Sequence, residues 1–542
     1  MAKQKKPATM GPVRQNLEAF GVAILAAVLL KWFCIEAYQI PTSSMQPTLM
    51  GSTEADVYDR ILVDKLIQTF REPQRWDITV FKYPLQKNQK YVKRIVGMPN
   101  DRLYIAGGNV YQTEGDGDAR TFVPIRKPDD LQACMWKNVY PARRLARAET
   151  KALPRIFGAS PSRAAEETDG GFALDPGGST ARLFFRDAED GGMIDRVWDG
   201  YPEEVARAIR NDVQHQRPQE IVPDVRIAAT VTAPAGMQEL ALEIEVLRPG
   251  HDERTFALVA AGGRATLQVR GKGDEVLAET QPFEFALPAG EPTEVAFAHV
   301  DDRLIAWHGG DEVQRLDTDA WAISEGCVLP FDPTKGLEIP ANQKVIPQFV
   351  CKGSGAVRLD DVRIDRDQHY TRDGAPEVIE VPAGHYYMMG DNTLQSVDSR
   401  GWTAITIGVD ANDNVVPPDS PDAVRTIRGN KRPMRLSNPP DRDETPIPIP
   451  SEDVIVMIDE YGEILRLNAE VGSDWPERVS FRRPGAGDGT DEWTAPDTTN
   501  AKGISFVPRE DIEGRALMVF YPSRPLSWIF RNAWPGRFGL VR

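Results

Sequence analysis

One apolar segment constrains this chain most, because it separates a short basic tail from some 500 residues of mostly polar sequence. Its uncharged core, Ala19–Leu30, has 12 residues, fewer than the roughly 20 that a membrane-spanning helix needs. Residues 17–38 reach that length if the Lys31 amine extends towards the lipid headgroups and Trp32 lies at the interface. The sequence therefore predicts an N-terminal transmembrane helix over residues 17–38.

The tail of residues 1–16 is basic, with Lys3, Lys5, Lys6 and Arg14. Because positively charged flanks stay in the cytoplasm, we expect a cytoplasmic N-terminus and an extracytoplasmic position for everything after about residue 40. A cleaved signal peptide is the alternative, since its apolar region has this length. We favour a retained anchor, which makes the protein single-pass in the cell (inner) membrane.

The charge balance argues against a nucleic-acid partner. The 542 residues carry 64 Lys and Arg against 80 Asp and Glu, a net charge of −16, whereas nucleic-acid binding needs a basic face. A chain of this length divides into roughly two to four domains. Its 44 glycines and 43 prolines suit β-structure with many turns, so the expected fold class is mainly β.

The cysteines and histidines do not form a recognisable metal site. The six histidines are scattered, and neither CxxC nor HExxH occurs. We therefore expect no metal and no cofactor. Cys327 and Cys351 could form a disulfide in an extracytoplasmic domain, but the sequence leaves this open.

Short alternating segments predict strands in two regions. Residues 57–111 contain strand-like runs separated by turns, such as Asp77–Phe81 and Tyr91–Val96. Residues 225–370 contain many more, at a spacing typical of a β-sandwich, for which we expect a jelly-roll or concanavalin-like topology.

Two further stretches lack that regular pattern. Residues 112–224 mix loops with short helical segments and are expected to be irregular. Residues 403–504 have the character of a second insertion, with a proline-rich linker near 438–450.

A serine segment, Ile40–Leu49, follows the apolar segment directly, and two prolines restrict its φ angles and favour an extended backbone. Ser44 is a candidate nucleophile if a base lies beside it, and a plain Ser/Thr/Pro loop is the alternative. No histidine is suitably placed, which leaves a lysine as the base. Lys93 lies in an apolar strand, where burial lowers the pKa from an ordinary value near 10.4. An exposed lysine on an edge strand is the alternative.

Four segments, in this order, resemble the sequence boxes of type I signal peptidases, the serine-lysine peptidase family that includes the bacterial leader peptidases. Ile40–Leu49 resembles the serine box, and Tyr91–Asp101, which reads YVKRIVGMPND, closely resembles the lysine box. Arg75–Pro84 resembles the strand box between them, and Gly390–Arg400 resembles the last box. The resemblance covers about 153 of the 542 residues, in 14–105, 380–402 and 505–542.

The resemblance implies the roles of the site residues. Ser44 would be the nucleophile and Lys93 the general base, with the Thr42 hydroxyl and the Ser44 backbone N–H forming the oxyanion hole. Ser396 would hydrogen-bond the Lys93 amine and orient it. The supporting groups would be an ion pair and a structural carboxylate: Asp398 with Arg400, and Asp391.

The chain departs from the family pattern at five positions near the site, none of them a proposed catalytic group. Trp76 and Asn100 stand where the family has glycine, and asparagine tolerates a positive φ. The other three departures follow the Gly-Asp-Asn sequence of the last box: Thr393, Gln395 and Thr403.

The resemblance implies a membrane-bound signal peptidase I, a serine endopeptidase that cleaves N-terminal signal peptides from exported preproteins through an acyl-enzyme. Its partners would be these preproteins and the lipid bilayer, with no nucleic acid, and the inserted sandwich could bind an unknown ligand. Because Lys93 and Ser396 must meet, we expect the chain to leave and re-enter the catalytic domain at nearby points.

The implied fold is a signal-peptidase-like antiparallel β catalytic domain assembled from three parts of the chain. The expected division is 1–16 cytoplasmic basic tail, 17–38 transmembrane anchor, 39–111 catalytic β-domain (first part), 112–224 irregular insertion, 225–370 inserted β-sandwich, 371–402 catalytic domain (second part), 403–504 second insertion with the proline-rich linker, and 505–542 catalytic domain (C-terminal part).

Two other classes of protein stay open. A non-enzymatic protein could use a degenerate peptidase core to display a binding sandwich at the cell surface, and the intact set of Ser44, Lys93 and Ser396 argues against it. A self-cleaving, repressor-like protein could share the serine-lysine chemistry. The predicted anchor and the lack of a basic DNA-binding domain near the N-terminus argue against that reading.

Overall fold

The structure of the chain is a computed structural model. It is mainly β, which confirms the expected fold class at that level. The residues that it describes are 12–52, 57–115, 120–141, 157–186, 192–196, 199–201, 221–247, 253–318, 344–372, 378–430, 447–449, 452–471, 480–482, 493–494, 497–499, 505–523 and 539–541.

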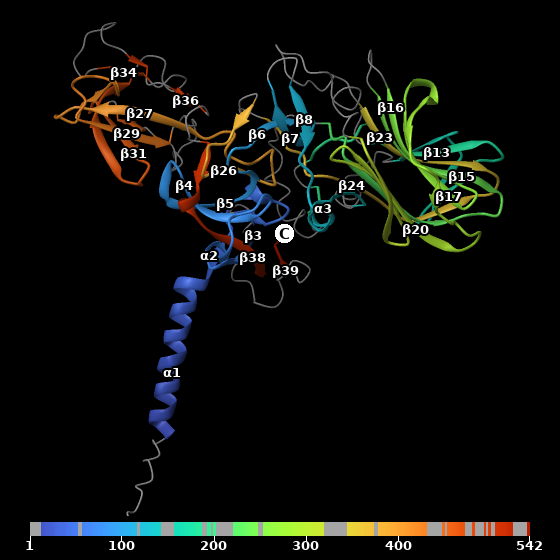
Figure 1. The fold of residues 1–542 in the computed structure, drawn as a ribbon, viewed down its shortest axis with the longest axis horizontal. Coiled ribbons are helices and arrows are strands. Elements are labelled where there is room, and N and C mark those ends of the chain that lie inside the picture. The colour runs from blue at the N-terminus through green and yellow to red at the C-terminus, as the bar shows by residue number, and fades with distance from the viewer. Residues whose placement is uncertain are drawn as a thin grey trace, which may run out of the picture.

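Three β-rich parts follow one another across the molecule in Figure 1. The central part combines strands from near both ends of the chain. The sandwich, coloured green to yellow, lies on one side of it, and a smaller part, coloured orange, lies on the other. A single long helix, α1 (Pro12–Leu29), projects from the central part.

The central part is built on a nine-stranded antiparallel sheet. Buried and half-buried residues alternate along its strand β3, as they do when one face of a strand is in the core. The short strands β2 (Gly51–Ser52) and β39 (Gly539–Leu540) pair with β3 and β38. The main path runs β1 (Ile35–Gln39), β3 (Val57–Asp64), β38 (Ile512–Ser523), β4 (Ile78–Tyr83), β5 (Gln86–Gly97), β26 (His385–Met389) and β37 (Phe506–Pro508).

A four-stranded sheet extends the central part towards the sandwich. Its side chains share a buried core with the large sheet, in which Leu103 and Ile379 lie with Val96 and Phe506. A short helix, α3 (Asp129–Met135), contributes Leu131 and Met135 to this core. The strands run in the order β25 (Ile379–Glu380), β6 (Arg102–Ala106), β7 (Asn109–Glu114) and β8 (Thr121–Pro124).

Two eight-stranded sheets form the sandwich, and the largest hydrophobic core cluster of the described residues draws side chains from both. One sheet contains β10 (Phe157–Ser160), β13 (Thr180–Phe185), β23 (Lys344–Gly353), β15 (Met237–Leu247), β16 (Arg254–Ala261), β17 (Arg264–Arg270), β18 (Val276–Glu279) and β19 (Phe283–Glu284). The other contains β11 (Ala165–Glu167), β12 (Gly171–Leu174), β24 (Val357–Arg366), β14 (Val225–Thr232), β20 (Pro292–Val300), β21 (Arg303–His308), β22 (Asp311–Asp317) and β9 (Lys137–Tyr140).

The expectation that residues 112–224 are irregular is wrong for the part that the structure describes. Five strands from this stretch, β9 to β13, belong to the two sandwich sheets, so the sandwich does not begin at residue 225. Each of the five is short and gains its stability by pairing with β23, β24 or a neighbour, and its alternation is too brief to detect in the sequence.

In β23, Cys351 is a buried free thiol, and burial raises its pKa to about 11. Cys327 lies outside the described residues.

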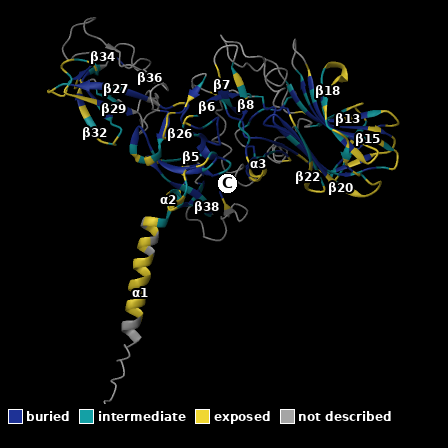
Figure 2. Cartoon of the chain, in the orientation of Figure 1, coloured by how far each residue is buried: buried dark blue, intermediate teal, exposed yellow. Residues whose placement is uncertain are grey.

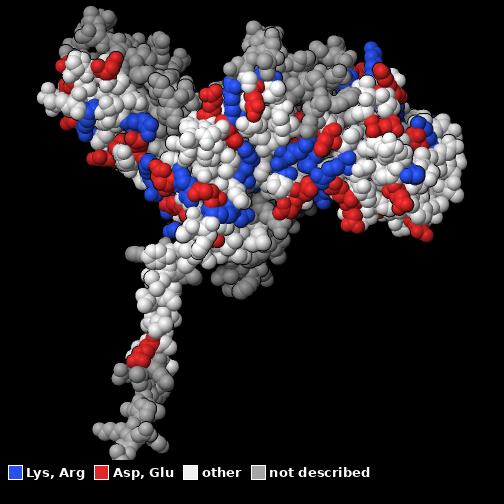
Figure 3. Space-filling model, in the orientation of Figure 1, with Lys and Arg blue, Asp and Glu red and all other residues white. Residues whose placement is uncertain are grey.

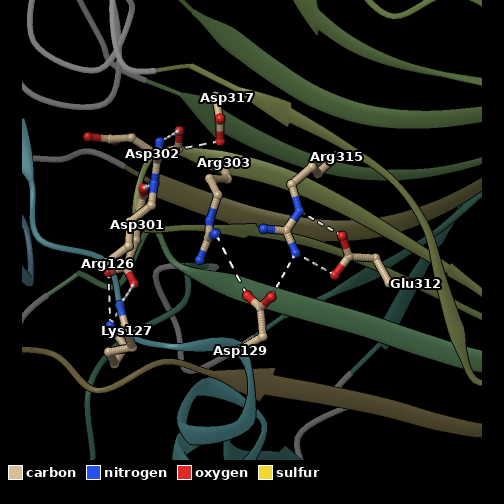
Figure 4. Close-up of polar contacts among 9 residues, drawn as sticks. All are labelled: Arg126, Lys127, Asp129, Asp301, Asp302, Arg303, Glu312, Arg315 and Asp317. Atoms are coloured by element: carbon tan, nitrogen blue, oxygen red, sulfur yellow. Dashed lines mark hydrogen bonds and ion pairs between the residues drawn. The ribbon is translucent and has the colours of Figure 1, made fainter.

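Ion pairs, some buried and some partly exposed, join the sandwich to the segment that leaves the central part (Figure 4). The Lys127 amine lies 2.8 Å from carboxylate oxygens of both Asp301 and Asp367, and all three side chains are buried. Asp129 at the start of α3 lies between Arg303 and Arg315 of strands β21 and β22. Because Lys127 precedes most of the insertion and Asp367 ends it, the exit and re-entry points of the chain lie together, as we expected.

The smaller part contains three short sheets between residues 403 and 499. A shared core that includes Ile407, Met457 and Phe481 joins them. Most of the proline-rich stretch at 438–450 lies outside the described residues, and 447–449 form a strand instead of a linker. The strands are β27 (Thr403–Val409), β28 (Val415–Val416), β29 (Arg425–Asn430), β30 (Ile447–Ile449), β31 (Val454–Ile458), β32 (Ile464–Asn468), β33 (Glu470–Val471), β34 (Ser480–Arg482), β35 (Trp493–Thr494) and β36 (Asp497–Thr499).

The helix of the expected anchor ends earlier than residue 38. After α1 comes a single π-helical turn, Leu30–Cys34, and residues 35–39 then pair with β3 as strand β1. Apolar side chains along α1 are exposed, among them Leu17 and Phe20, each 65% exposed (Figure 2). Within the described part of the chain, no helix has both the length and the apolar character needed to cross a membrane.

Candidate active site

The serine segment folds into a short turn at the nucleophile position. Ser43–Met45 form one 3₁₀ turn, closed by the Gln46 N–H donating to the Ser43 carbonyl at 3.1 Å. The expected extended backbone is found on either side, at Thr42 and Gln46, but not at Ser44. The turn points the side chain of Ser44, which is 9% exposed, towards the central sheet.

Lys93 lies on β5 of the central sheet, and its side chain reaches Ser44. Its Nζ is 2.5 Å from Ser44 Oγ, and the lysine is 4% exposed. The amine also lies 5.8 Å from the centre of the Tyr91 ring. The alternative of an exposed lysine on an edge strand is therefore excluded, and in its neutral form this amine could take the hydroxyl proton directly.

The hydroxyl of Thr42 lies on the same side of the turn as the Ser44 hydroxyl. The two oxygens are 3.5 Å apart, at the outer limit of a hydrogen bond. This spacing leaves the Thr42 hydroxyl free to turn towards an atom that binds at Ser44. The position is compatible with the oxyanion role that the resemblance implies.

Ser396 does not make the expected hydrogen bond to Lys93. Its Oγ is buried and has no hydrogen-bond partner among the described residues, although it is near enough to the Asp398 carboxylate to help lower the pKa of that group. The hydroxyl packs against Gly390, where an added Cβ would overlap both Ser396 Oγ and the Ser44 carbonyl oxygen. The Lys93 amine contacts the Ser44 hydroxyl instead of the predicted partner, the Ser396 hydroxyl.

The predicted ion pair between Asp398 and Arg400 is present and fully buried. Arg400 donates two hydrogen bonds, from Nε at 2.7 Å and from Nη2 at 2.8 Å, to the two carboxylate oxygens. The Gly390 N–H donates a third, at 3.0 Å. Burial alone would raise the pKa of Asp398, but the Arg400 charge and these hydrogen bonds hold it below its usual value. Asp398 therefore stays ionised and faces Arg400.

Asp391 has a partner that the sequence reasoning missed, the residue next to the candidate base. Arg94 donates to both Asp391 oxygens, at 2.8 and 2.7 Å, and neither residue is exposed. Thr48 of the serine segment donates a further hydrogen bond at 2.5 Å. Since side chains alternate along a strand, Arg94 points to the other face from Lys93. An arginine buried there needs a carboxylate, and this is the signal that could have found the pair.

Asn392 is a second residue that was missed. Its backbone N–H donates to the Ser44 carbonyl and its side-chain amide donates to the Ser43 carbonyl, each at 3.1 Å. The Gly-Asp-Asn turn therefore holds the backbone of the nucleophile through two carbonyl groups. No spacing in the sequence predicts this contact, because 348 residues separate the two segments.

Two of the departures from the family pattern contact the end of the insertion. Trp76 adopts a positive φ of 74° and stacks on Tyr370, with ring centres 6.2 Å apart. The Thr393 hydroxyl donates to the His369 carbonyl at 2.7 Å. Asn100 also has a positive φ, 69°, which asparagine tolerates.

Comparison with known proteins shows what the sequence around this site resembles. A family model described as signal peptidase, peptidase S26, matches residues 13–127 and 339–416. A signal peptidase I of Leptolyngbya laminosa is 31% identical over 113 residues, which are 19% of this chain and 52% of that protein. One of Aquifex aeolicus is 40% identical over 90 residues, 17% of this chain and 32% of that protein. The chain thus spans about half of the first of these two relatives and about a third of the second.

Solved structures resemble the chain only loosely. A sheep galectin-11 structure overlays 26% of this chain and 87% of that one, with 17% identity and a TM-score of 0.16. A carbohydrate-binding module of Bacillus subtilis overlays 39% of this chain and 95% of that one, with 6% identity and a TM-score of 0.22. Scores this low carry no conclusion. The sequence match is informative: two segments of this chain, with most of the sandwich between them, match the family model of signal peptidase, peptidase S26.

Proposed function

We propose that the chain is a membrane-bound signal peptidase I, a serine endopeptidase that removes N-terminal signal peptides from exported preproteins. The observation that carries the proposal is the buried contact of 2.5 Å between Lys93 Nζ and Ser44 Oγ. A nucleophile and a base at this distance form the minimum machinery for acyl transfer. The family match and the order of the four boxes agree with this chemistry.

The reaction would begin when Ser44 Oγ attacks the carbonyl carbon after a small residue of the preprotein and passes its proton to Lys93. The oxyanion that forms would accept hydrogen bonds from the Ser44 N–H and the Thr42 hydroxyl. Protonated Lys93 then gives the proton to the leaving amine as the peptide bond breaks. A water molecule, deprotonated by Lys93, hydrolyses the acyl-enzyme and restores the Ser44 hydroxyl.

The proposal assigns supporting roles to the two buried carboxylates and to Ser396. Asp398 and Arg400, like Asp391 and Arg94, would hold the last box against the serine segment while keeping their negative charges away from the lysine. Lys93 could then lose its proton without a carboxylate ion pair opposing the loss. Ser396, buried next to Gly390, would support the dyad through packing and not through a hydrogen bond in the resting enzyme.

The membrane location is part of the same proposal. The support is the row of exposed apolar side chains on α1 and the nearly uncharged surface of this helix in Figure 3. The helix would anchor the enzyme with its N-terminus in the cytoplasm and the three β-rich parts outside. Substrate would then arrive along the bilayer, and the sandwich would be free to bind a ligand of its own.

The test is cleavage of a preprotein with an Ala-x-Ala site by the full chain in detergent. Wild type should cut after the second alanine, and Ser44→Ala and Lys93→Ala should each abolish cutting while the protein stays folded. Lys90→Ala is the matched control, since Lys90 lies on the same strand with its side chain 37% exposed. Cleavage by either dyad variant at the wild-type rate would disprove the assignment. No cleavage by folded wild type would favour the surface-binding reading.

A further inference from the structure

The serine segment receives a hydrogen bond from the insertion. The Tyr201 hydroxyl donates to the side-chain carbonyl of Gln46, two residues after the nucleophile. Tyr201 is 4% exposed and Gln46 is 2% exposed, so solvent cannot replace this contact. The two residues come from parts of the sequence that the family resemblance does not link.

Gln46 holds the segment around Ser44 together. Its amide nitrogen donates to the Gly51 carbonyl at 2.8 Å. Gly51 in turn lies so close to the start of the segment that an added Cβ would be 2.5 Å from the Ile40 carbonyl oxygen and 2.7 Å from that of Thr42. Gln46 therefore links the turn that carries Ser44 to Gly51, which packs against the first residues of the same segment. A shift of Gln46 would move Ser44.

Tyr201 is itself fixed by the sandwich. The preceding Gly200 donates its N–H to the carbonyl of Asn138, in strand β9, at 3.0 Å. Asp199 accepts a hydrogen bond of 2.5 Å from Arg366, the last residue of β24. Arg366 also donates to the Arg196 carbonyl at 3.1 Å, and it is buried. The position of the Tyr201 hydroxyl is thus set by strands of the sandwich.

A second contact reaches the site from the same strands. Lys137, the first residue of β9, is buried and donates from Nζ to the Asp391 carbonyl at 2.9 Å. It contacts the turn that holds the Ser44 backbone, whereas Tyr201 contacts the serine segment. The serine segment and the turn at Asp391 therefore both contact the part of the sandwich that contains β9 and β24.

We propose that Tyr201 is a positioning residue for Ser44 and that the docked sandwich is part of the support of the active site. The inference rests on the proposed peptidase function and goes beyond it, since it gives the insertion a role in the reaction. Tyr201 acts through Gln46 and does not touch the substrate. Removing its hydroxyl should therefore displace the Ser44 hydroxyl from its reactive position and should leave substrate binding unchanged.

The experiment compares the wild-type chain with Tyr201→Phe on the same preprotein peptide. The variant should lose about 10-fold in kcat with KM within about two-fold, because small misplacements of a nucleophile cost rate before they cost binding. Tyr370→Phe is the control, since its hydroxyl is also buried at the end of the insertion but makes no hydrogen bond among the described residues. It should keep the wild-type kcat. An active wild type with an equally active Tyr201→Phe would overturn the inference and leave the peptidase proposal intact.

A double-mutant cycle separates positioning from a general loss of structure. Gln46→Met keeps the length of the side chain and removes the amide, so it should lower kcat as much as Tyr201→Phe does. The double variant should then be no slower than the slower single variant, because both changes break one connection. Additive losses in kcat would show that Tyr201 does not act through Gln46. If Tyr201→Phe does not fold, the kcat and KM of Gln46→Met decide: an unchanged kcat would overturn the inference.

Discussion

At the scale of single residues, the proposed oxyanion role of the Thr42 hydroxyl can be tested directly. It lies 3.5 Å from Ser44 Oγ and would bind the oxyanion only as charge develops. We therefore expect Thr42→Val to lower kcat by about 10- to 1,000-fold and to leave KM nearly unchanged. Steady-state kinetics on a signal-peptide substrate measure both constants. Thr42→Ser keeps the hydroxyl and should keep most of the activity, whereas a variant that raises KM at constant kcat would contradict the oxyanion role.

The pair of Arg94 and Asp391 should contribute stability and not chemistry. Both side chains are buried, and Arg94 holds both carboxylate oxygens. Arg94→Met would leave a buried charge without its main partner, so the free energy of unfolding should fall by about 3–5 kcal/mol. Denaturant unfolding measures the loss. Arg425→Met is the control, because its ion pair with Asp413 is about half exposed and should be worth less than about 1 kcal/mol. Equal losses in the two variants would refute the assignment.

The turn at Gly390 shows how one element sets the geometry of another. Its Cα lies between Ser396 and the carbonyl of Ser44, and a Cβ would overlap both. Gly390→Ala should therefore push the serine turn away from Lys93 and lower kcat by about 100-fold or more. Gly401→Ala, eleven residues on, is the matched control, because a Cβ there meets nothing within 4 Å. It should cleave at the wild-type rate, and loss of activity in both variants would mean that glycine flexibility, not this contact, matters.

Elements with a strong local signal could be predicted from the sequence, and those that depend on distant partners could not. Lys93 and Ser44 stand in sequence boxes that resemble a known family, so their pairing was expected. Strands β9 to β13 are short and owe their place to pairing, directly or through a neighbour, with β23 and β24, which follow them by about 160 residues or more. The contact of Tyr201 with Gln46 joins residues 155 apart in the chain. Only the folded chain reveals such a contact.

At the scale of the whole molecule, the insertion leaves and returns at one place. Tyr370 donates its N–H to the Gly108 carbonyl at 2.9 Å, and Lys127 pairs with Asp367. A long insertion whose ends meet costs the central part little entropy, because loop-closure entropy rises only with the logarithm of length. The close ends also explain why the sandwich can support the serine segment: it is docked beside the site and not tethered at a distance.

Removing the lysine at this junction should make the stability of the protein depend on pH. Lys127 lies between Asp301 and Asp367, with Asp224 beside them. Burial raises the pKa of Asp367 and the Lys127 charge lowers it, although the pKa stays above its usual value. In Lys127→Met that pKa should rise further. A carboxyl whose pKa is raised by folding costs stability as pH rises through the folded-state value, and the cost fades as pH falls towards the unfolded value near 3.8.

Lys127→Met should therefore be less stable than wild type by about 3–5 kcal/mol near pH 8 and by clearly less near pH 5. Thermal unfolding of both proteins at the two pH values measures the difference. Lys352→Met, in strand β23 of the sandwich, is the control, because its ion pair with Glu239 is partly exposed, and its small effect should not change with pH over this range. A deficit in Lys127→Met that is the same at both pH values would mean that the carboxylates at the junction are solvated, and the sandwich would then not be held by a buried lysine.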